Sequence, residues 1–415
     1  MRIGQSESSA AELLGTHVCS AGTQACTDNT STNQEICGNG IDDDCDGSDL
    51  SCPAYELIVD YEADHGTWIL WDGLYWTQLH SGSPDEIISA NTDGNATDEL
   101  LVDFGSGTGV WIWDPSASPK WRKFHDNSPN AIIPCDAEGN GSEELAIDLG
   151  PGTGVWLWRA DTKTPWRKFY DTSPLAITPA DTDGDENEEL VVNISVDAGL
   201  WLWSEVFTPR KWRKFYDVSP LGVTAADLDG DGADELVVNI GEQAGIWYWN
   251  STMPQGNRWT KFFDSSSENI IRADVDGDGR DDLIVNLGVS DGLHYWNPAN
   301  PPGDKWKKIR GQIPELMVAA DIDSDGKYEL VADFGTGTGL RIYRDVGGGV
   351  WQWTTQAPPD ELGLDENASS GALAVGNLGS ALRAGETTRS FDTEAAPRTP
   401  DRVISPSPDR TRGRR

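Results

Sequence analysis

An acidic cluster recurs in this chain every 45 to 47 residues, and each copy runs directly into an apolar segment followed by a segment rich in aromatic residues. The two cleanest copies read Asp-Leu-Asp-Gly-Asp-Gly-Ala-Asp-Glu from Asp227 and Asp-Val-Asp-Gly-Asp-Gly-Arg-Asp-Asp from Asp274. Self-similarity at a fixed period of this length indicates a repeat architecture. The pattern extends over residues 56–377, so it predicts one repetitive body rather than several independent domains.

Each repeat contains four short segments of β-branched and aromatic residues, separated by Gly, Asn, Pro and Ser. In one unit these segments are residues 221–226, 236–240, 245–249 and 258–263, each of which is too short for a helix. A four-stranded antiparallel unit repeated radially is the blade of a β-propeller. Seven such units predict an all-β fold, a seven-bladed β-propeller of four-stranded antiparallel blades.

The first unit begins part-way, at Glu56, with no acidic loop or inner strand before it. Residues 372–379 resemble the missing inner strand and the beginning of its loop, so we expect the C-terminal strand to complete the first blade. The predicted division is a Cys- and Asp-rich segment at 1–54, the propeller at 55–380, and a disordered tail at 381–415, which is polar and rich in proline.

The net charge of −38 and the isoelectric point near 4.2 disfavour nucleic-acid binding, which requires a basic surface. Basic pairs such as Arg122 and Lys123 lie beside aromatic residues, and we interpret them as solvated strand faces. The chain contains no apolar run long enough for a transmembrane helix. We expect a domain that is monomeric.

Cysteine usage is uneven along the chain. Five cysteines crowd into the first 52 residues, namely Cys19, Cys26, Cys37, Cys45 and Cys52. This crowding is typical of a disulfide framework in an oxidising compartment, with zinc binding as the alternative, although no Cys-x-x-Cys occurs. Cys135 instead occupies a position that is Ala in the other repeats, so we expect a small buried thiol there. The N-terminus lacks the layout of a secretory signal. We therefore expect an extracellular or cell-surface protein whose signal lies upstream of this chain.

The acidic loops offer carboxylates at alternate positions, with glycines that permit a tight turn. Ca²⁺ takes six to eight oxygen ligands in flexible geometry, so such a loop suits it. An EF-hand is excluded, because its position 12 would fall on Val238 or Val285, within a strand rather than on a bidentate Glu.

The pattern Asp-x-Asp-Gly-Asp-Gly-x-Asp-(Asp/Glu)-Leu resembles the FG-GAP/VCBS repeat, which occurs in the seven-bladed head of integrin α subunits and in bacterial surface proteins. The sequences Phe104-Gly105 and Phe334-Gly335 match the motif that names the family. The resemblance implies calcium ligands at positions 1, 3, 5 and 9 through side chains and at position 7 through the backbone carbonyl. In the three later loops these are Asp227, Asp229, Asp231, Ala233 and Glu235; Asp274, Asp276, Asp278, Arg280 and Asp282; and Asp321, Asp323, Asp325, Lys327 and Glu329.

The three earlier loops depart from the pattern, with fewer carboxylates, an overlong ligand or no glycine at position 6. Their corresponding residues are Asp181, Asp183, Asp185, Asn187 and Glu189; Asp136, Glu138, Asn140, Ser142 and Glu144; and Asn91, Asp93, Asn95, Thr97 and Glu99. We expect weaker calcium binding there. The alternative for all six loops is a turn held only by hydrogen bonds from side chain to backbone. Repulsion among clustered carboxylates favours a cation.

The N-terminal segment resembles the Cys- and Asp-rich motif of MopE-like bacterial surface proteins, through the run Glu-Ile-Cys-Gly-Asn-Gly-Ile-Asp-Asp-Asp-Cys-Asp-Gly-Ser-Asp. The resemblance implies four further calcium ligands, Asp42, Asp44, Asp46 and Asp49. The alternative is an acidic linker pinned by disulfides.

The aromatic residues recur at fixed positions in the repeats. Tryptophans two residues apart share one face of a strand, so we expect them to pack between blades. Exposed tryptophans that stack on sugar rings are the alternative. His80 and His125 occupy positions held elsewhere by Tyr or Phe, so we expect them to act as aromatic filling, and the recurring Asp-x-Ser-Pro segments are predicted turns.

No motif for a nucleophile, a phosphate loop or a catalytic metal occurs in the sequence. The sequence therefore predicts a secreted or surface-bound propeller that binds Ca²⁺ and acts as a non-catalytic adhesion module for an extracellular protein or glycan. The alternatives are a lectin, the propeller domain of a polysaccharide-active lyase or hydrolase, and a spacer for another domain.

Overall fold

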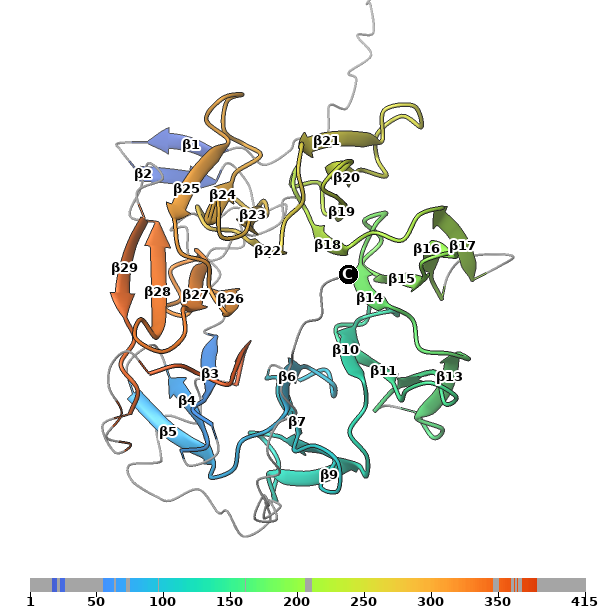
Figure 1. The fold of residues 1–415 in the computed structure, drawn as a ribbon, viewed down its shortest axis with the longest axis vertical. Coiled ribbons are helices and arrows are strands. Elements are labelled where there is room, and N and C mark those ends of the chain that lie inside the picture. The colour runs from blue at the N-terminus through green and yellow to red at the C-terminus, as the bar shows by residue number, and fades with distance from the viewer. Residues whose placement is uncertain are drawn as a thin grey trace, which may run out of the picture.

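Seven four-stranded antiparallel sheets stand in a ring around a central axis (Figure 1). The computed structural model describes residues 17–20, 23–26, 55–62, 65–71, 75–95, 97–160, 162–205, 211–345, 351–359, 362, 364 and 368–378. Within these residues the ring is a seven-bladed β-propeller with no α-helix, as predicted. A separate two-stranded pair, β1 (His17–Ser20) and β2 (Thr23–Cys26), precedes it.

We number the blades in ring order and give each from its innermost strand outward. Blade 1 consists of β30 (Ala372–Gly376), β3 (Glu56–Asp60), β4 (Thr67–Trp71) and β5 (Tyr75–His80). Blade 2 consists of β6 (Glu86–Ala90), β7 (Glu99–Asp103), β8 (Val110–Trp113) and β9 (Trp121–His125). Blade 3 consists of β10 (Ala131–Cys135), β11 (Glu144–Asp148), β12 (Val155–Trp158) and β13 (Trp166–Tyr170). Blade 4 consists of β14 (Ala176–Ala180), β15 (Glu189–Ser195), β16 (Gly199–Trp203) and β17 (Trp212–Tyr216).

The remaining three blades follow the same order. Blade 5 consists of β18 (Gly222–Ala226), β19 (Glu235–Gly241), β20 (Gly245–Trp249) and β21 (Trp259–Phe263). Blade 6 consists of β22 (Asn269–Ala273), β23 (Asp282–Asn286), β24 (Leu293–Trp296) and β25 (Trp306–Arg310). Blade 7 consists of β26 (Leu316–Ala320), β27 (Glu329–Asp333), β28 (Leu340–Asp345) and β29 (Trp351–Thr355).

The second strand of each blade has an apolar sequence without alternation because both of its faces are buried against neighbouring blades. In β7, Leu100 and Val102 pack toward blade 1, against residues that include Ile58. Leu101, between them, points the other way and packs against Leu145 of blade 3. A strand buried on both faces reads as a continuous apolar run. The core of this protein is therefore a set of interfaces between blades, arranged around the ring.

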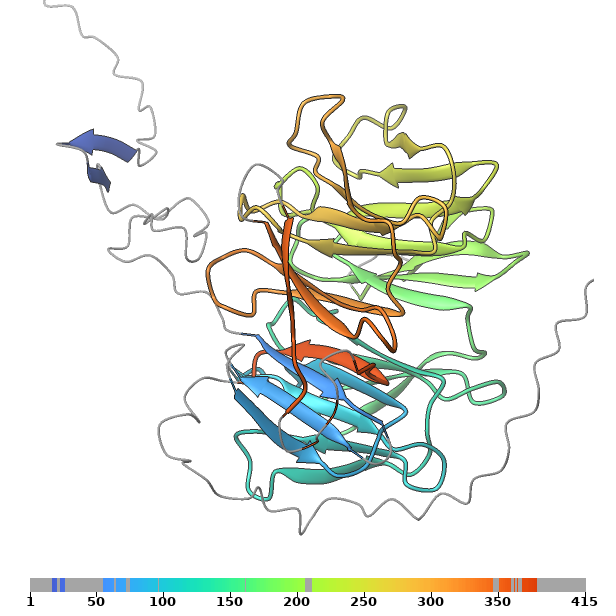
Figure 2. The ribbon, with the colours of Figure 1, turned by 60° about the vertical axis from the view of Figure 1, so that its left-hand side comes forward.

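The ring closes through the C-terminal strand, as predicted. β30 pairs antiparallel with β3, in a register that places Ala374 opposite Ile58. Figure 2 shows β30, in red, beside the blue strands β3 and β4. Leu378, just past β30, is fully buried, and its backbone N–H donates to the Glu56 carboxylate at 2.8 Å. The first and last strands of the propeller thus share one sheet.

The last tryptophan of the third strand packs against the preceding blade in blades 3 to 6, as predicted for these residues, whereas the first tryptophan of the blade 3 pair, Trp156, lines an outer pocket. Trp158 of blade 3 meets Phe124 of blade 2 edge to face, with ring centroids 5.0 Å apart, and Trp203 of blade 4 meets Phe169 of blade 3 at 4.9 Å. His80 lies 4.5 Å from the ring of Phe104, so it fills an aromatic position as expected. Such edge-to-face pairs add to the stability gained from burial.

The predicted Asp-x-Ser-Pro segments are turns that tie each blade to the preceding one. Ser128 donates to the buried carboxylate of Asp103, and Ser173 donates to Asp148 at 2.7 Å. Cys135 is a free, fully buried thiol on β10, as predicted. These polar groups serve the fold rather than chemistry.

Three predictions fall outside the described residues or side chains. They are the N-terminal disulfides, the metal motif at Asp42, Asp44, Asp46 and Asp49, and the tail at 381–415. Of the part of the chain that the structure describes, no helix has the length and apolar character needed to span a membrane.

Candidate metal centres

The six acidic segments form the hairpin loops between the first and second strands of blades 2 to 7. We call them acidic loops 2 to 7 after their blades. Loop 2 is 91–99, loop 3 is 136–144, loop 4 is 181–189, loop 5 is 227–235, loop 6 is 274–282 and loop 7 is 321–329. Because the blades are equivalent, all six loops lie on the same face of the ring.

The side-chain oxygen at position 1, from Asp in loops 3 to 7 and from Asn91 in loop 2, organises each loop by accepting backbone hydrogen bonds. In loop 5, one oxygen of Asp227 accepts the N–H of Gly230 at 2.7 Å, and the other accepts the N–H of Gly232 at 3.0 Å. Both glycines have positive φ, of 75° and 83°, which costs an L-residue energy. Loop 4 has Glu186 at the second of these positions with φ of 68°, so its turn is strained as the sequence suggested.

Five loops gather carboxylate oxygens within 4.8 Å of one another. Loops 4, 5 and 6 do so through positions 1, 3 and 9, loop 7 through positions 1, 3 and 5, and loop 2 through positions 3 and 9 with one residue from elsewhere. The clusters are Asp181, Asp183 and Glu189; Asp227, Asp229 and Glu235; Asp274, Asp276 and Asp282; Asp321, Asp323 and Asp325; and Asp93, Glu99 and Asp114. Within the described residues, loop 3 forms no such cluster.

The side chain at position 5 has a different task in most loops. In loop 5 the Asp231 carboxylate accepts the N–H of Ala233, at position 7, at 3.0 Å. The same contact recurs in the other loops, between Asp185 and Asn187, Asp278 and Arg280, Asp325 and Lys327, Asn140 and Ser142, and Asn95 and Thr97. Position 5 therefore stabilises the turn, and in loop 7 its carboxylate also belongs to the cluster.

The residue at position 9 is buried with one oxygen unpartnered in two loops. Glu99 and Glu189 are fully buried, and in each the oxygen Oε2 accepts a backbone N–H, from Thr92 at 2.9 Å and from Thr182 at 3.0 Å. The other oxygen, Oε1, has no hydrogen-bond partner among the described residues. Buried polar atoms are almost always satisfied, so an unpartnered oxygen beside further carboxylates is suited to coordinate a cation.

Burial also disfavours the charged form of these groups. Loss of hydration raises the pKa of Glu99 and of Glu189 to about 7, and it raises the pKa of Glu235 and of Asp282 to about 8. Neighbouring carboxylates add to the shift, as Asp229 does for Glu235. A divalent cation among these oxygens would offset the loss of hydration and favour ionisation.

A further residue, which sequence reasoning did not single out, faces the cluster in blades 2, 5, 6 and 7. It directly follows the last aromatic residue of the third strand, and we call it the facing residue. In blade 5 it is Asn250, whose amide donates to Asp229 at 2.9 Å and also to Glu235, at positions 3 and 9. In blade 6 it is Asn297, whose amide donates to Asp276 at 2.8 Å. These amides hold the carboxylates in place.

In blade 2 the facing residue is Asp114, which brings a third carboxylate to loop 2. Its Oδ1 accepts the N–H of Ser116 at 2.8 Å and of Ala117 at 3.0 Å, so this oxygen caps the following turn. The side chain lies with Asp93 and Glu99 in one cluster. Asp114 thereby replaces the charge that loop 2 lacks at position 1, where it has Asn. The fixed place of this residue after the aromatic is the signal that would have identified it.

Neighbouring loops are joined to one another through position 8. The backbone N–H of Asp234 in loop 5 donates to the carbonyl of Asp181 in loop 4 at 2.6 Å, and its carboxylate accepts the Asp181 N–H at 3.0 Å. The same pairing joins Glu143 to Asn91, Glu188 to Asp136 and Asp281 to Asp227. Each loop is therefore fixed to the loop of the preceding blade.

Three further contacts complete this series around the ring. They join Asp98 to Asn377, Tyr328 to Asp274 and Tyr55 to Asp321, with N–H to carbonyl distances of 2.6, 2.8 and 3.2 Å. Every blade thus contributes one donor, and we call the closed series the loop belt. Each acidic loop is therefore also a segment that holds two neighbouring blades together.

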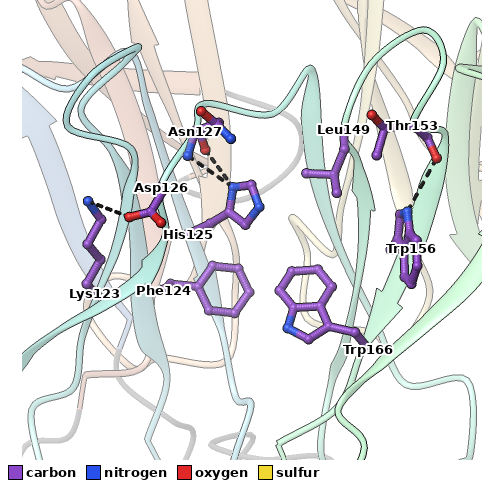
Figure 3. Close-up of a pocket in the computed structure, with 9 residues that line it drawn as sticks. All are labelled: Lys123, Phe124, His125, Asp126, Asn127, Leu149, Thr153, Trp156 and Trp166. Atoms are coloured by element: carbon purple, nitrogen blue, oxygen red, sulfur yellow. Dashed lines mark hydrogen bonds and ion pairs between the residues drawn. The ribbon is translucent and has the colours of Figure 1, made fainter.

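A pocket of about 590 Å³ lies between the outer strands of blades 2 and 3 (Figure 3). Its walls are aromatic, with Phe124 and Trp166 at a ring distance of 5.6 Å. His125 points toward the same space, and its Nδ1 contacts the backbone of Asn127 at 2.8 Å. Asp126 also lines the pocket, and its carboxylate pairs with Lys123 at 3.0 Å. This pocket is distinct from the acidic loops and is built from aromatic and polar groups side by side.

Comparisons with known proteins leave the family open. No family model matches the chain, and no curated protein matches it. Among solved structures, the chain is similar to the periplasmic gluconolactonase of Pseudomonas aeruginosa, at 13% identity and a TM-score of 0.46, over 77% of this chain and 98% of that one. It is similar to a putative 6-phosphogluconolactonase of Bacteroides fragilis, at 9% identity and a TM-score of 0.47, over 77% and 97%. A likeness to BBS1N in complex with ARL6DN has 13% identity and a TM-score of 0.42, over 69% and 84%.

These likenesses are too distant to support any statement about function. The class that the fold and its loops define is a seven-bladed β-propeller whose acidic hairpins have the geometry to hold metal ions.

Proposed function

We propose that this protein is a secreted or surface-bound propeller that binds Ca²⁺ in its acidic loops and serves as a non-catalytic adhesion or ligand-binding module. The observation that carries the calcium assignment is the fully buried, unpartnered Oε1 of Glu99 and of Glu189, each within a cluster of carboxylates. Hard oxygen donors in a flexible loop suit Ca²⁺ better than Zn²⁺, which is bound mainly by sulfur and nitrogen. The resemblance of the loops to FG-GAP/VCBS repeats supports the same ion and an extracellular setting.

The bound ions would act first on the fold. In loops 4, 5 and 6 the cluster joins the beginning of the loop to the first residue of the second strand, as Asp227 and Glu235 do in loop 5. The loop belt then connects that segment to the next blade. Calcium in this position neutralises buried carboxylates that repel one another without it. The propeller would thus present a rigid surface to its partner only in calcium-rich surroundings.

Thermal unfolding with calcium and with chelator tests this function. Extracellular modules bind calcium with Kd of roughly 10⁻⁴–10⁻³ M, so at about 2 mM calcium a loop at the tight end gains about 1.8 kcal/mol. Several loops together raise the melting temperature by on the order of 10 °C. A melting temperature that is the same with calcium and with chelator refutes the assignment.

A matched pair of variants in loop 4 localises the effect. Glu189→Gln removes a carboxylate from the cluster, so the calcium-dependent shift becomes smaller. Glu186→Gln changes an exposed residue of the same loop that belongs to no cluster, so the shift stays as in the wild type. An equal loss in both variants would point to nonspecific charge effects.

Glycan binding is a second candidate, favoured by the pocket between blades 2 and 3. Flat aromatic faces beside hydrogen-bonding groups are the chemistry that recognises sugar rings, and Trp166, Phe124 and Asp126 provide both. A glycan screen on the calcium-loaded protein tests it, with Trp166→Ala expected to abolish any binding. Trp212→Ala, at the equivalent place beside Tyr170, is the control and should leave binding intact.

A further inference from the structure

The facing residue of blade 3 is a cation. Arg159 follows Trp158, the last aromatic residue of β12. Its guanidinium pairs with Glu138, at position 3 of loop 3, and lies 3.6 Å from Glu144, at position 9. These are the two positions that Asn250 bridges in loop 5. The guanidinium therefore lies where the other loops bring their carboxylates together.

The position of this guanidinium is fixed from a second blade. Arg159 lies 3.4 Å from Glu205 of blade 4, and Glu205 also pairs with Arg167 and Lys211. The Arg159 side chain is only 16% exposed. An arginine keeps its charge at any accessible pH, and its planar group suits carboxylates on several sides. Arg159 therefore places a permanent positive charge beside loop 3.

We propose that Arg159 takes the place of the metal ion in loop 3, so that this loop binds no calcium while loops 4, 5 and 6 do. The inference rests on the proposed calcium-binding function. It explains why loop 3 has the carboxylates Asp136, Glu138 and Glu144 but gathers no cluster within 4.8 Å. Asp136 remains engaged with the backbone, since it accepts the N–H of Gly141 at 2.7 Å.

In blade 7 the facing residue is also an arginine, but it is more exposed than Arg159. Its facing residue, Arg344, lies 3.0 Å from Asp323 and 3.4 Å from Glu329, again positions 3 and 9. Its side chain is 40% exposed, and loop 7 keeps a cluster that includes Asp321 and Asp325. Arg344 therefore competes with a metal ion without excluding it. On this proposal the facing residue sets calcium occupancy in blades 2, 3, 5, 6 and 7, with Arg opposing it, Asn leaving it intact and Asp114 adding a ligand.

Counting bound calcium in exchanged variants tests this inference. Equilibrium dialysis of the whole chain against calcium, followed by metal analysis, gives the number of ions per molecule. Arg159→Asn gives loop 3 the facing residue of loops 5 and 6, so the count rises by one. Asn250→Arg gives loop 5 the guanidinium of loop 3, so the count falls by one.

A second pair of variants leaves the facing residues as in the wild type and removes only one negative charge each. Glu138→Gln, at position 3 of loop 3, leaves the count unchanged, whereas Asp229→Asn, at position 3 of loop 5, lowers it by one. An unchanged count in Arg159→Asn, or a loss of one ion in Glu138→Gln, overturns the role of Arg159 while calcium binding itself stands. A wild-type protein that binds no calcium overturns both proposals.

Discussion

Removing the closing strand tests whether the propeller is held as a ring. A chain that ends at Gly371 lacks β30 and everything after it, including the fully buried Leu378. β3 then becomes the innermost strand of blade 1, and the backbone groups of Glu56–Asp60 that paired with β30 face the axis without partners. We expect this truncation to remove most of the stability of the whole propeller rather than to loosen one blade.

The magnitude follows from the contacts that are lost. Five residues of β30 pair with β3, which corresponds to about four backbone hydrogen bonds at about 1 kcal/mol each. Full burial of Leu378 contributes about 2–3 kcal/mol, and partial burial of Leu373 and Val375 about 1 kcal/mol each. The total of about 8–9 kcal/mol is comparable with the entire free energy of unfolding of a typical domain, about 5–15 kcal/mol.

Urea unfolding followed by tryptophan fluorescence measures the effect. The control is a chain that ends at residue 380, which retains β30 and should unfold at the wild-type urea concentration. Leu378→Ala is a milder version and should cost about 2–5 kcal/mol, as expected for a cavity in a packed core. If the chain that ends at Gly371 unfolds at the same urea concentration as its control, ring closure by β30 does not stabilise the fold.

Three further predictions concern single groups. Because Ca²⁺ requires ionised carboxylates and the pKa of Glu235 and of Asp282 is raised to about 8, protons compete below that pH. Calcium affinity at loops 5 and 6 should fall up to about tenfold for each pH unit between 8 and 6, and titration calorimetry should record proton release on binding; an affinity independent of pH would contradict this. The Cys135 thiol, fully buried and with its pKa raised by burial, should react with a thiol reagent only when the protein unfolds, and rapid labelling of the native protein would contradict this. Asp103→Ala should lower stability by about 2 kcal/mol in urea unfolding, because it leaves the half-buried Ser128 hydroxyl and the buried Gly105 N–H without an acceptor; a change below about 0.5 kcal/mol would show that water replaces the carboxylate.

The fold was predictable because its signals are local and repeated. Apolar segments such as the one around Leu100 repeat at a fixed distance from a turn. Seven repetitions of a four-stranded unit are compatible with few fold architectures. Ring closure was also accessible, because the segment that contains Ala374 resembles the strand missing before Glu56. Position 9 of each loop was identified as acidic and lies at the beginning of a buried strand, as Glu189 does.

The facing residue was harder to predict from the sequence, because its contacts join two turns of one blade that lie far apart along the chain. Asn250 meets Asp229 across 21 residues of sequence, and Arg159 meets Glu138 across the same separation. Arginine after a tryptophan reads in sequence as one more solvated cation. Counting carboxylates within loop 2 likewise omits Asp114, which comes from another turn. The order of calcium affinities among the loops stays a prediction, and the proposed role of the facing residue adds a second determinant to it.

The loop belt would make the proposed calcium binding a collective property of the ring. Each loop is held by its neighbours on both sides, so no loop of the series is terminal. An ion that orders loop 5 also fixes Asp181 of loop 4 and the segment that contains Asp281 of loop 6, and it thereby spares the next ion part of the entropy of ordering those loops. Binding that becomes easier as sites fill is positive cooperativity, without any change of global conformation. Where Arg159 supplies a permanent charge, one part of the circle is ordered before any calcium arrives, and we expect filling to begin at the loops beside it.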